Sequence, residues 1–177
     1  MCREDERLPR GGAAVKIAPR STSGERRVRI GLISDTHDLL RPEALAFLVG
    51  SDHIVHGGDV CDASILDALA AIAPLTAVRG NNDRGAWAAR LRESELVRVG
   101  DVWIYAIHDR AQIDIDPVAA GVGVVVSGHS HRPSVEERDG VLYVNPGSAG
   151  PRRFRLPISV GELTITGGAV AARTVEL

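Results

Sequence analysis

Aromatic side chains are scarce in this chain. Phe, Trp and Tyr make up 3% of the 177 residues, although apolar residues in total reach 44%. The core must therefore be built from Val, Leu, Ile and Ala, and surfaces on which nucleic-acid bases stack are disfavoured because they need aromatic rings. The formal net charge of −2 provides no strong basic field, so the composition argues against nucleic acid as a partner.

Cysteine and long apolar runs are scarce as well. Cys2 and Cys61 are the only cysteines, too few for a disulfide framework, which favours a reducing compartment. No apolar run approaches the ~18 residues of a membrane-spanning helix, and the N-terminus lacks the apolar segment of a signal peptide. We therefore expect a cytoplasmic protein without a membrane partner.

The chain divides into two parts. Residues 1–27 mix Arg, Gly, Pro, Ser and Thr without apolar periodicity, which predicts a disordered tail, with a functional basic arm as the alternative. Residues 28–177 have the length of one domain with a full hydrophobic core, and they contain no internal repeat. We expect a single domain there, and a homo-oligomer is compatible with the sequence.

The first half of this domain alternates between two apolar patterns. Short β-branched runs predict strands, and longer stretches with helical spacing predict helices. The order is strand, helix, strand, helix, strand, the signature of parallel strands joined by crossover helices. The expected elements are strands at 28–34, 53–56 and 75–79, with helices at 42–49 and 63–73.

The second half is predicted to form hairpins and one buried strand. Gly100-Asp101, Asp139-Gly140 and Gly167-Gly168 are turn signals between apolar runs. Two sheets packed together, with helices outside, would bury the apolar faces of all these elements. The expected strands are 96–99 with 102–107, 121–126, 134–138 with 141–144, and 159–166 with 169–175.

Polar clusters follow five of the predicted strands, where the ligand sites of α/β sheets lie. Asp, Asn and His are typical ligands of first-row metals. Seven such ligands exceed the need of one tetrahedral zinc and suit two metals sharing a carboxylate, for which Asp59 is the expected bridge. The pairs Asp35/His37 and His129/His131 are spaced i, i+2, which on extended backbone points both side chains to one side. The candidate ligands are Asp35, His37, Asp59, Asn81, His108, His129 and His131.

In order along the chain, the motifs D-x-H, GD, GN-x-D, H and GH-x-H resemble those of the calcineurin-like metallophosphoesterase superfamily. Their short spacing and the segment 145–148 resemble its small YfcE-like phosphodiesterase branch. The resemblance implies an α/β (α+β) fold, a four-layer αββα sandwich with two mixed β-sheets and outer helices. It also implies that Asp35, His37, Asp59 and His131 hold one metal, that Asp59, Asn81, His108 and His129 hold a second, and that Asp83 orients a neighbouring ligand.

Two positions depart from the family pattern. Asn82 stands where many members carry the histidine that protonates the leaving group, and Arg110 stands where the branch commonly has a second histidine. Neither side chain gives up a proton near neutral pH, which affects the protonation step and the substrate preference. Asn82 and Arg110 are still candidates for catalysis and substrate binding. Arg152, in the basic run 152–155, is a further candidate for phosphate recognition, with a solvated face as the alternative.

These features predict a metal-dependent phosphodiesterase that also accepts monoesters, with a small-molecule phosphate ester as substrate. Two divalent ions clamp the phosphate and generate a bridging hydroxide that attacks phosphorus. Manganese is the expected metal, with iron, zinc and nickel as alternatives. Two other functions compete with this one: a metal-free or weakly active protein-binding scaffold, as in the retromer subunit of this fold, and a small nuclease. We interpret His53 and His56 as structural, and Cys61 as a small buried thiol.

Overall fold

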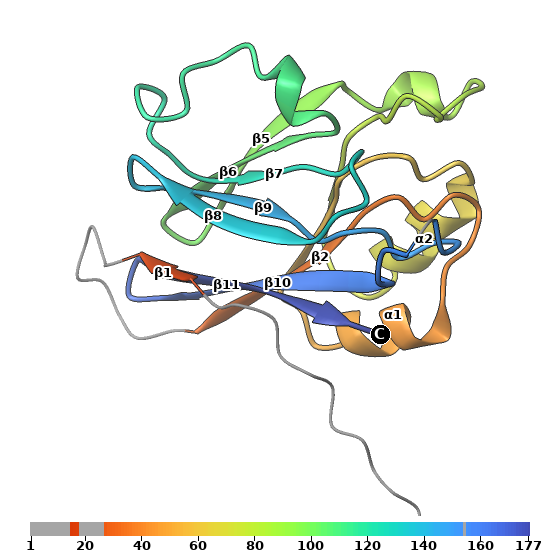
Figure 1. Cartoon of the computed structure of the whole chain (residues 1–177), viewed down its shortest axis with the longest axis horizontal. Helices are drawn as coiled ribbons and strands as arrows, with labels where there is room; N and C mark the ends of the chain where they lie inside the picture. The colour runs from red at the N-terminus through yellow and green to blue at the C-terminus, as the bar shows by residue number, and fades with distance from the viewer. Residues whose placement is uncertain (1–14, 18–26, 154) are drawn as a thin grey trace, which may run out of the picture.

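The computed structural model describes residues 15–17, 27–153 and 155–177, which form two β-sheets packed face to face (Figure 1). The six-stranded sheet has the order β1-β11-β10-β2-β3-β4, and the five-stranded sheet has the order β5-β6-β7-β9-β8. The first sheet consists of β1 Val15–Ile17, β2 Val28–Ile33, β3 His53–His56, β4 Leu75–Ala77, β10 Ser159–Thr166 and β11 Ala169–Glu176. The second consists of β5 Ser94–Val99, β6 Val102–Ile107, β7 Val122–Val126, β8 Ser134–Arg138 and β9 Val141–Asn145.

Three parallel strands in each sheet determine where the loops gather. β2, β3 and β4 run parallel in the first sheet, and β6, β7 and β9 run parallel in the second. The loops at their carboxyl ends are joined across the two sheets, because Ala149 N donates to Ser34 O at 3.0 Å and Gly150 N donates to Asp35 O at 3.2 Å. Loops from both sheets therefore meet at one end of the sandwich.

The core between the sheets is made of aliphatic side chains, as the scarcity of aromatics predicts. Ile30 and Leu32 of β2 face Val124 and Val126 of β7 in one buried cluster. The spacing of two residues in each strand reflects the alternation of side chains along an extended backbone. The predicted strands of the second half and the strand–helix order of the first half are confirmed, with ends shifted by a few residues.

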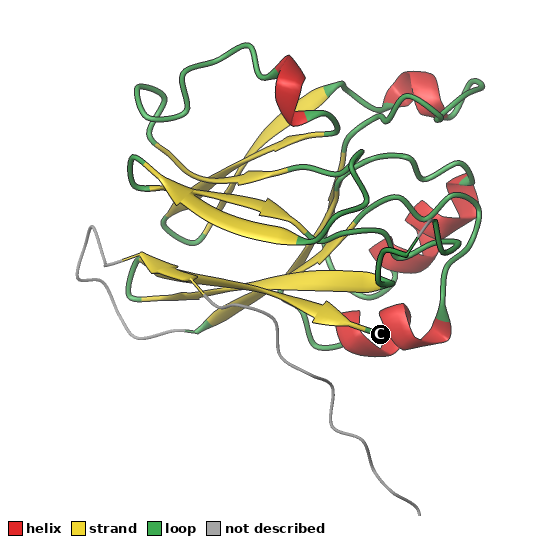
Figure 2. Cartoon of the chain, in the orientation of Figure 1, coloured by secondary structure: helices red, strands yellow, loops and turns green. Residues whose placement is uncertain are grey.

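Helices α1 (Pro42–Leu48) and α2 (Ala63–Ala70) cover the outer face of the first sheet (Figure 2). Leu48 and Leu69 are fully buried and pack with Ile54 of β3 in a second cluster. Each helix follows a parallel strand and returns the chain to the start of the next one, which is the crossover geometry expected from the sequence. A 3₁₀ turn, η1 (Ala88–Arg90), follows β4.

The outer face of the second sheet is covered differently from the expected helical layer. Segment 109–121 lies over it with a single 3₁₀ turn, η2 (Arg110–Gln112), and its Ile113 and Ile115 pack against Tyr105. Two apolar residues spaced by two, followed by Pro117, do not supply the apolar stripe of a helix. The two-sheet fold class is confirmed, with this loop in place of the fourth layer.

The expected tail contains one strand. Residues 1–27 were predicted to be disordered, but β1 pairs antiparallel with β11, with Lys16 opposite Ala171. The edge of β11 would otherwise present unpaired backbone groups, and β1 pairs with part of that edge, at residues 170–172. Residues 1–14 and 18–26 of the expected tail lie outside the described part of the chain.

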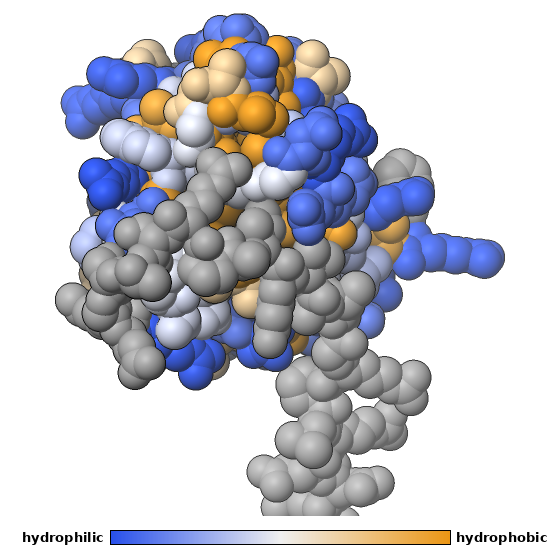
Figure 3. Space-filling view, turned by 90° about the vertical axis from the view of Figure 1, so that its left-hand side faces the viewer, coloured by the Kyte–Doolittle hydropathy of each residue, from blue (hydrophilic) through white to orange (hydrophobic). Residues whose placement is uncertain are grey.

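Figure 3 shows the end of the sandwich away from the gathered loops, where an apolar group in the upper part lies among hydrophilic side chains. Among the described residues, the large exposed apolar side chains include Val118 and Trp103. No helix in the described ranges is long and apolar enough to cross a membrane.

Candidate metal centre

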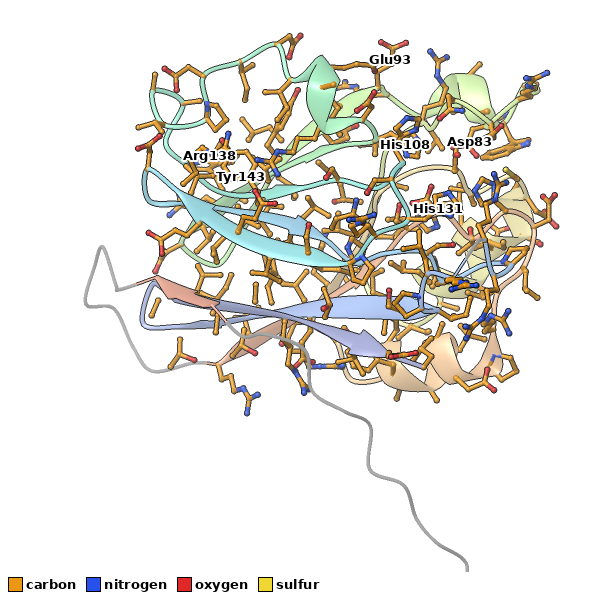
Figure 4. The ribbon with its side chains drawn as sticks, viewed as in Figure 1. Asp83, Glu93, His108, His131, Arg138 and Tyr143 are labelled. Atoms are coloured by element: carbon orange, nitrogen blue, oxygen red, sulfur yellow. The ribbon has the colours of Figure 1, made fainter. Side chains whose placement is uncertain are left out.

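The loops that follow five parallel strands carry the seven predicted ligands. Figure 4 shows His108 and His131 at the end of the sandwich where these loops meet. Asp35 and His37 follow β2, Asp59 follows β3, Asn81 follows β4, His108 follows β6, and His129 and His131 follow β7. The parallel direction of these strands therefore brings residues that are far apart in sequence to one site.

The first group of donor atoms is buried. His131 Nε2 lies 3.2 Å from Asp35 Oδ1 and 3.3 Å from His37 Nε2. His37 Nε2 lies 3.9 Å from Asp35 Oδ1 and 3.7 Å from Asp59 Oδ2. The side chains of Asp35 and Asp59 are almost fully enclosed. Two ring nitrogens and two carboxylate oxygens thus converge in a space that excludes most water.

The second group of donor atoms opens to solvent. Asn81 Oδ1 lies 3.0 Å from His108 Nε2 and 3.1 Å from His129 Nδ1. His108 Nε2 is also 3.5 Å from Asp59 Oδ2. Asn81 and His129 are exposed, whereas His108 is buried. A molecule from solvent can therefore reach this group past Asn81 and His129.

The spacing of the donor atoms fits divalent metals. Metal–ligand bonds of about 2.0–2.2 Å place neighbouring ligands of an octahedron or tetrahedron about 2.8–3.6 Å apart. Most of the distances above fall in or near that range, and Asp59 Oδ2 is common to both groups. Within the described part of the chain, the buried Asp35 Oδ1 accepts no hydrogen bond, so a cation there would compensate its charge. The residues can hold divalent metal ions.

Hydrogen bonds keep Asp59 ionised. Asn82 donates to both of its oxygens, from the backbone N to Oδ1 at 2.7 Å and from Nδ2 to Oδ2 at 2.6 Å. Burial alone would raise the pKa of Asp59, but the hydrogen bonds from His108 and Asn82 hold that pKa well below its usual range. Asp59 is therefore a carboxylate throughout the physiological pH range and is ready to bind a cation.

Two ligand imidazoles are oriented by groups on the β3 loop. His108 Nδ1 donates to Gly57 O at 2.8 Å, which leaves Nε2 directed toward the donor cluster. His37 Nδ1 lies 3.7 Å from Cys61 Sγ. Contacts of this kind, on the ring nitrogen that does not bind metal, fix ring orientation in metal sites. Partial burial, with Asp83 next, raises the pKa of Cys61 to about 12, so Cys61 stays a thiol, although it is half-buried and not buried as we expected.

Asp83 holds the β3 and β4 loops together. Its Oδ2 accepts from Gly80 N at 2.7 Å and from Asp59 N at 3.0 Å, and its Oδ1 accepts from Cys61 N at 2.7 Å. Gly80 is required by this close approach, because a Cβ atom there would lie 2.2 Å from Asp59 N. Asp83 thus positions Asp59 through backbone contacts.

The ligand backbone differs from the extended conformation that we expected. Asp35 and His37 have φ values of 53° and 44°, and His129 and His131 have 65° and 57°. These values lie in the left-handed region, which is uncommon for residues other than glycine. Asp35 and His37 approach each other on a loop that curls tightly after its strand, whereas His129 and His131 contribute to different donor groups. The expected reason for the spacing was therefore wrong.

The three predicted substrate-binding residues have different surroundings. Asn82 lies at the centre but is bonded to Asp59. Arg110 donates to Glu136 at 3.0 Å, and its guanidinium lies 4.5 Å from the centroid of the Tyr143 ring, which Figure 4 shows toward the opposite end of the sheet. This placement gives no support to a role for Arg110 in catalysis or substrate binding. Arg152 is exposed in the loop before β10.

A cavity of about 460 Å³ adjoins the second donor group, and sequence reasoning missed three of the residues that line it. We call it the Gln112 cavity. No motif marked Glu93, Asp109 or Gln112 as ligand-binding residues, because only the fold brings the segment before β5 and the η2 turn beside the candidate ligands. The lining residues are Arg79, Gly80, Asn81, Glu93, His108, Asp109, Gln112 and His129.

Comparisons with known proteins find relatives of this chain. The profile of the calcineurin-like phosphoesterase superfamily domain matches residues 28–168. A probable metallophosphoesterase of Methanocaldococcus jannaschii is 36% identical over 150 residues, which cover 77% of this chain and 75% of that protein. Another, from Methanothermobacter thermautotrophicus, is 36% identical over 159 residues, which cover 83% of this chain and 91% of that protein.

A solved structure shares the fold at lower sequence identity. Vacuolar protein sorting 29 of Cryptosporidium parvum superposes with a TM-score of 0.74 at 20% identity, over 85% of this chain and 92% of that one. The profile match covers most of the chain, and both archaeal relatives carry the name metallophosphoesterase. This chain therefore belongs to the calcineurin-like phosphoesterase superfamily.

Proposed function

We propose that this protein is a two-metal phosphoesterase that hydrolyses phosphodiesters and accepts monoesters. The observation that carries the proposal is the position of Asp59 Oδ2, which is 3.7 Å from His37 Nε2 in one donor group and 3.5 Å from His108 Nε2 in the other. A carboxylate oxygen shared in this way is what two adjacent metals require. Manganese suits the mixture of imidazole, carboxylate and amide oxygen, with iron, zinc or nickel as alternatives.

Divalent ions at the two groups would polarise the phosphate and activate a water molecule for attack on phosphorus. The residues of the chain have distinct tasks in this reaction. Asp35, His37 and His131 keep their side of the centre buried, which strengthens electrostatic interactions there. Asn81 and His129 face solvent and leave space for the ester. Asp83 keeps the backbone of Asp59 in place.

Two measurements test the proposal together. Elemental analysis of the purified protein should find about two divalent ions per chain. Hydrolysis of bis-p-nitrophenyl phosphate and p-nitrophenyl phosphate should appear with added Mn²⁺ and disappear with a chelator. A protein that binds two ions yet hydrolyses neither ester would overturn the proposal.

The complete donor set also bears on the scaffold alternative. Because the fold is similar to that of Vacuolar protein sorting 29, binding of a partner protein is the second candidate function of this chain. A scaffold has no need of seven converging metal donors, whereas here all seven are present and close together. The proposed hydrolase accounts for them, and an absence of both metal and turnover would instead favour the scaffold.

A further inference from the structure

The Gln112 cavity lies beside the second donor group and shares residues with it. Asn81, His108 and His129 contribute to both. Figure 4 shows Glu93 and His108 on the same side of the molecule. A volume of about 460 Å³ is within the usual range of small-molecule sites, about 300–1,000 Å³. An ester whose phosphate lies at the metal centre can therefore extend one alcohol substituent into this cavity.

The walls of the Gln112 cavity are polar. Beyond the metal donors they present a guanidinium and a carboxylate that form an ion pair, Arg79 with Glu93, together with the Asp109 carboxylate and the Gln112 amide. No leucine, isoleucine, valine or phenyl ring is among the eight lining residues. A second cavity of about 380 Å³ contrasts with it, because Leu66, Leu75 and Leu96 line that one.

One carboxylate in the Gln112 cavity is already fixed in place. Asp109 Oδ1 accepts from Ala111 N at 2.9 Å, which caps the η2 turn. Its Oδ2 lies 4.0 Å from His129 Nε2. A side chain held at one oxygen keeps the other as an oriented acceptor, and little entropy is lost when a ligand binds to it. Gln112 is carried on the same turn and adds both a donor and an acceptor.

We propose that the Gln112 cavity is a subsite for a polyhydroxylated alcohol, so that the substrates are phosphate esters of polyols or sugars. Each hydroxyl is both a donor and an acceptor. The carboxylates of Asp109 and Glu93 accept from hydroxyl groups, and Arg79 and Gln112 donate to hydroxyl oxygens. An alkyl substituent would leave these groups without partners from the ligand, and sites built for hydroxyl groups discriminate against analogues that lack them. The inference rests on the proposed function, because the phosphate must sit at the metal centre.

A pair of matched inhibitors tests this subsite. Glycerol 3-phosphate and propyl phosphate have the same carbon chain and phosphate, and they differ only in two hydroxyl groups. Competition against bis-p-nitrophenyl phosphate with the Mn²⁺-loaded protein should give an inhibition constant about tenfold lower for glycerol 3-phosphate, as expected for one to two net hydrogen bonds. Equal inhibition by the two compounds would overturn the proposal.

Variants of the lining residues test whether the difference between the two inhibition constants depends on the cavity. Gln112→Ala and Glu93→Gln should each bring the ratio of the two inhibition constants toward one, whereas Glu137→Gln, an exposed change on β8, should leave the ratio unchanged. 2-Aminoethyl phosphate tests for a cation subsite instead. Tighter inhibition by this compound than by glycerol 3-phosphate would contradict a polyol subsite.

The failure of this inference can be separated from failure of the proposed function. If the aryl diester is hydrolysed but the inhibitors do not differ, the phosphoesterase stands and the polyol subsite falls. If no ester is hydrolysed, the proposed function falls. In that case, calorimetric titration of the Mn²⁺-loaded protein with glycerol 3-phosphate and with propyl phosphate tests the polyol subsite. Equal affinity for the two compounds, or no binding of either, would overturn the subsite.

Discussion

At the scale of single residues, both donor groups depend on Asp59. Asp59→Asn keeps the size of the side chain but removes the charge that both groups share. We expect loss of bound metal and a fall in turnover of more than about 100-fold, since removal of a group that only supports a ligand already costs 10–100-fold. Elemental analysis and aryl diester hydrolysis measure the two effects.

The matched control is Asp139→Asn, in the turn between β8 and β9. Asp139 has a φ of 53°, and asparagine tolerates that conformation as well as aspartate does. This control should keep both metal and turnover. Near-normal turnover in Asp59→Asn would show that the two-metal interpretation is wrong.

Asn82 is exposed, yet its side-chain amide donates to Asp59. Asn82→Ala removes the 2.6 Å hydrogen bond from Nδ2 to Asp59 Oδ2 but keeps the backbone bond to Oδ1. Loss of a supporting partner of this kind lowers metal affinity about 10–100-fold. Competition with a chromophoric chelator measures the affinity. Unchanged affinity with reduced turnover would instead place Asn82 in contact with the substrate, as the sequence suggested.

His56 is expected to make the fold sensitive to acid. It is fully buried, its Nδ1 accepts from Gly58 N at 3.1 Å, and its Nε2 lies 3.2 Å from Thr36 Oγ1. Thr36 Oγ1 in turn donates to Val60 O, so this chain of bonds suits the neutral ring with its proton on Nε2. Burial lowers the pKa of His56 from 6.5 to about 4.

The sign of the pH effect follows from that lowered pKa. The unfolded chain takes up a proton below about pH 6.5 and the folded chain does so only near pH 4. Stability is therefore complete above pH 6.5 and declines by up to about 3 kcal/mol as the pH falls to 4. Urea unfolding of metal-free protein across this range measures the slope. His56→Asn cannot titrate there, and an equally steep slope in that variant would contradict the assignment.

At the scale of elements, an ionic clamp joins three strands and a helix. Arg29 of β2 and Arg173 of β11 donate to the two oxygens of Glu162 on β10, at 2.7 and 2.6 Å. Arg29 also donates to Phe47 O in α1 at 2.6 Å. Burial alone would raise the pKa of Glu162, but the two arginines hold the pKa below its ordinary value.

Glu162→Gln should therefore destabilise the fold. Each arginine loses a charged partner, and hydrogen bonds to charged groups contribute about 1.5–3 kcal/mol to the free energy of unfolding. The pKa of Glu162 in the folded chain is lower than the ordinary glutamate pKa of 4.5. The stabilisation is therefore complete when the pH is above that ordinary pKa, and it is lost as the pH falls through the lowered pKa. Denaturant unfolding at neutral pH measures the loss. Glu137→Gln, exposed on β8, serves as the control, and equal stability of the two variants would contradict the clamp.

The elements could be predicted from sequence wherever the local pattern agrees with the tertiary structure. The turn at Asp139-Gly140 was found because both residues need positive φ, and they have 53° and 75°. β1 was missed because nothing local distinguishes 15–17 from a tail; its stability comes from pairing with β11. The loop over the second sheet was missed because its apolar residues are too few to indicate what they cover.

At the scale of the whole molecule, the convergence of the seven candidate ligands could be predicted, but the Gln112 cavity beside them could not. All five ligand motifs follow strands, and parallel strands bring such ends together, so sequence order was sufficient. The Gln112 cavity joins Glu93, which directly precedes β5, with Gln112 of η2 and residues of the β4 loop, and no spacing in the sequence records that proximity. Arg110 was misleading for the same reason, because only the fold shows that its side chain turns toward Tyr143.

The N-terminal strand leads to a prediction about the whole sandwich. A chain shortened to residues 27–177 lacks β1 and exposes the edge of β11, so we expect more self-association. Loss of about 1 kcal/mol would lower the melting temperature by about 2–4 °C. Thermal unfolding and size-exclusion chromatography measure the two effects. A chain of residues 15–177 keeps β1 and should behave like the full sequence, and identical behaviour of both shortened chains would show that β1 contributes nothing.

The left-handed backbone of the ligand loops has a consequence for how this protein evolves. Five of the seven donors, Asp35, His37, Asp59, His129 and His131, have positive φ, and each costs on the order of 1 kcal/mol relative to glycine. A lineage freed from selection for metal chemistry would gain stability from each glycine that drift introduced at these positions. The donor set would then be among the first features to erode.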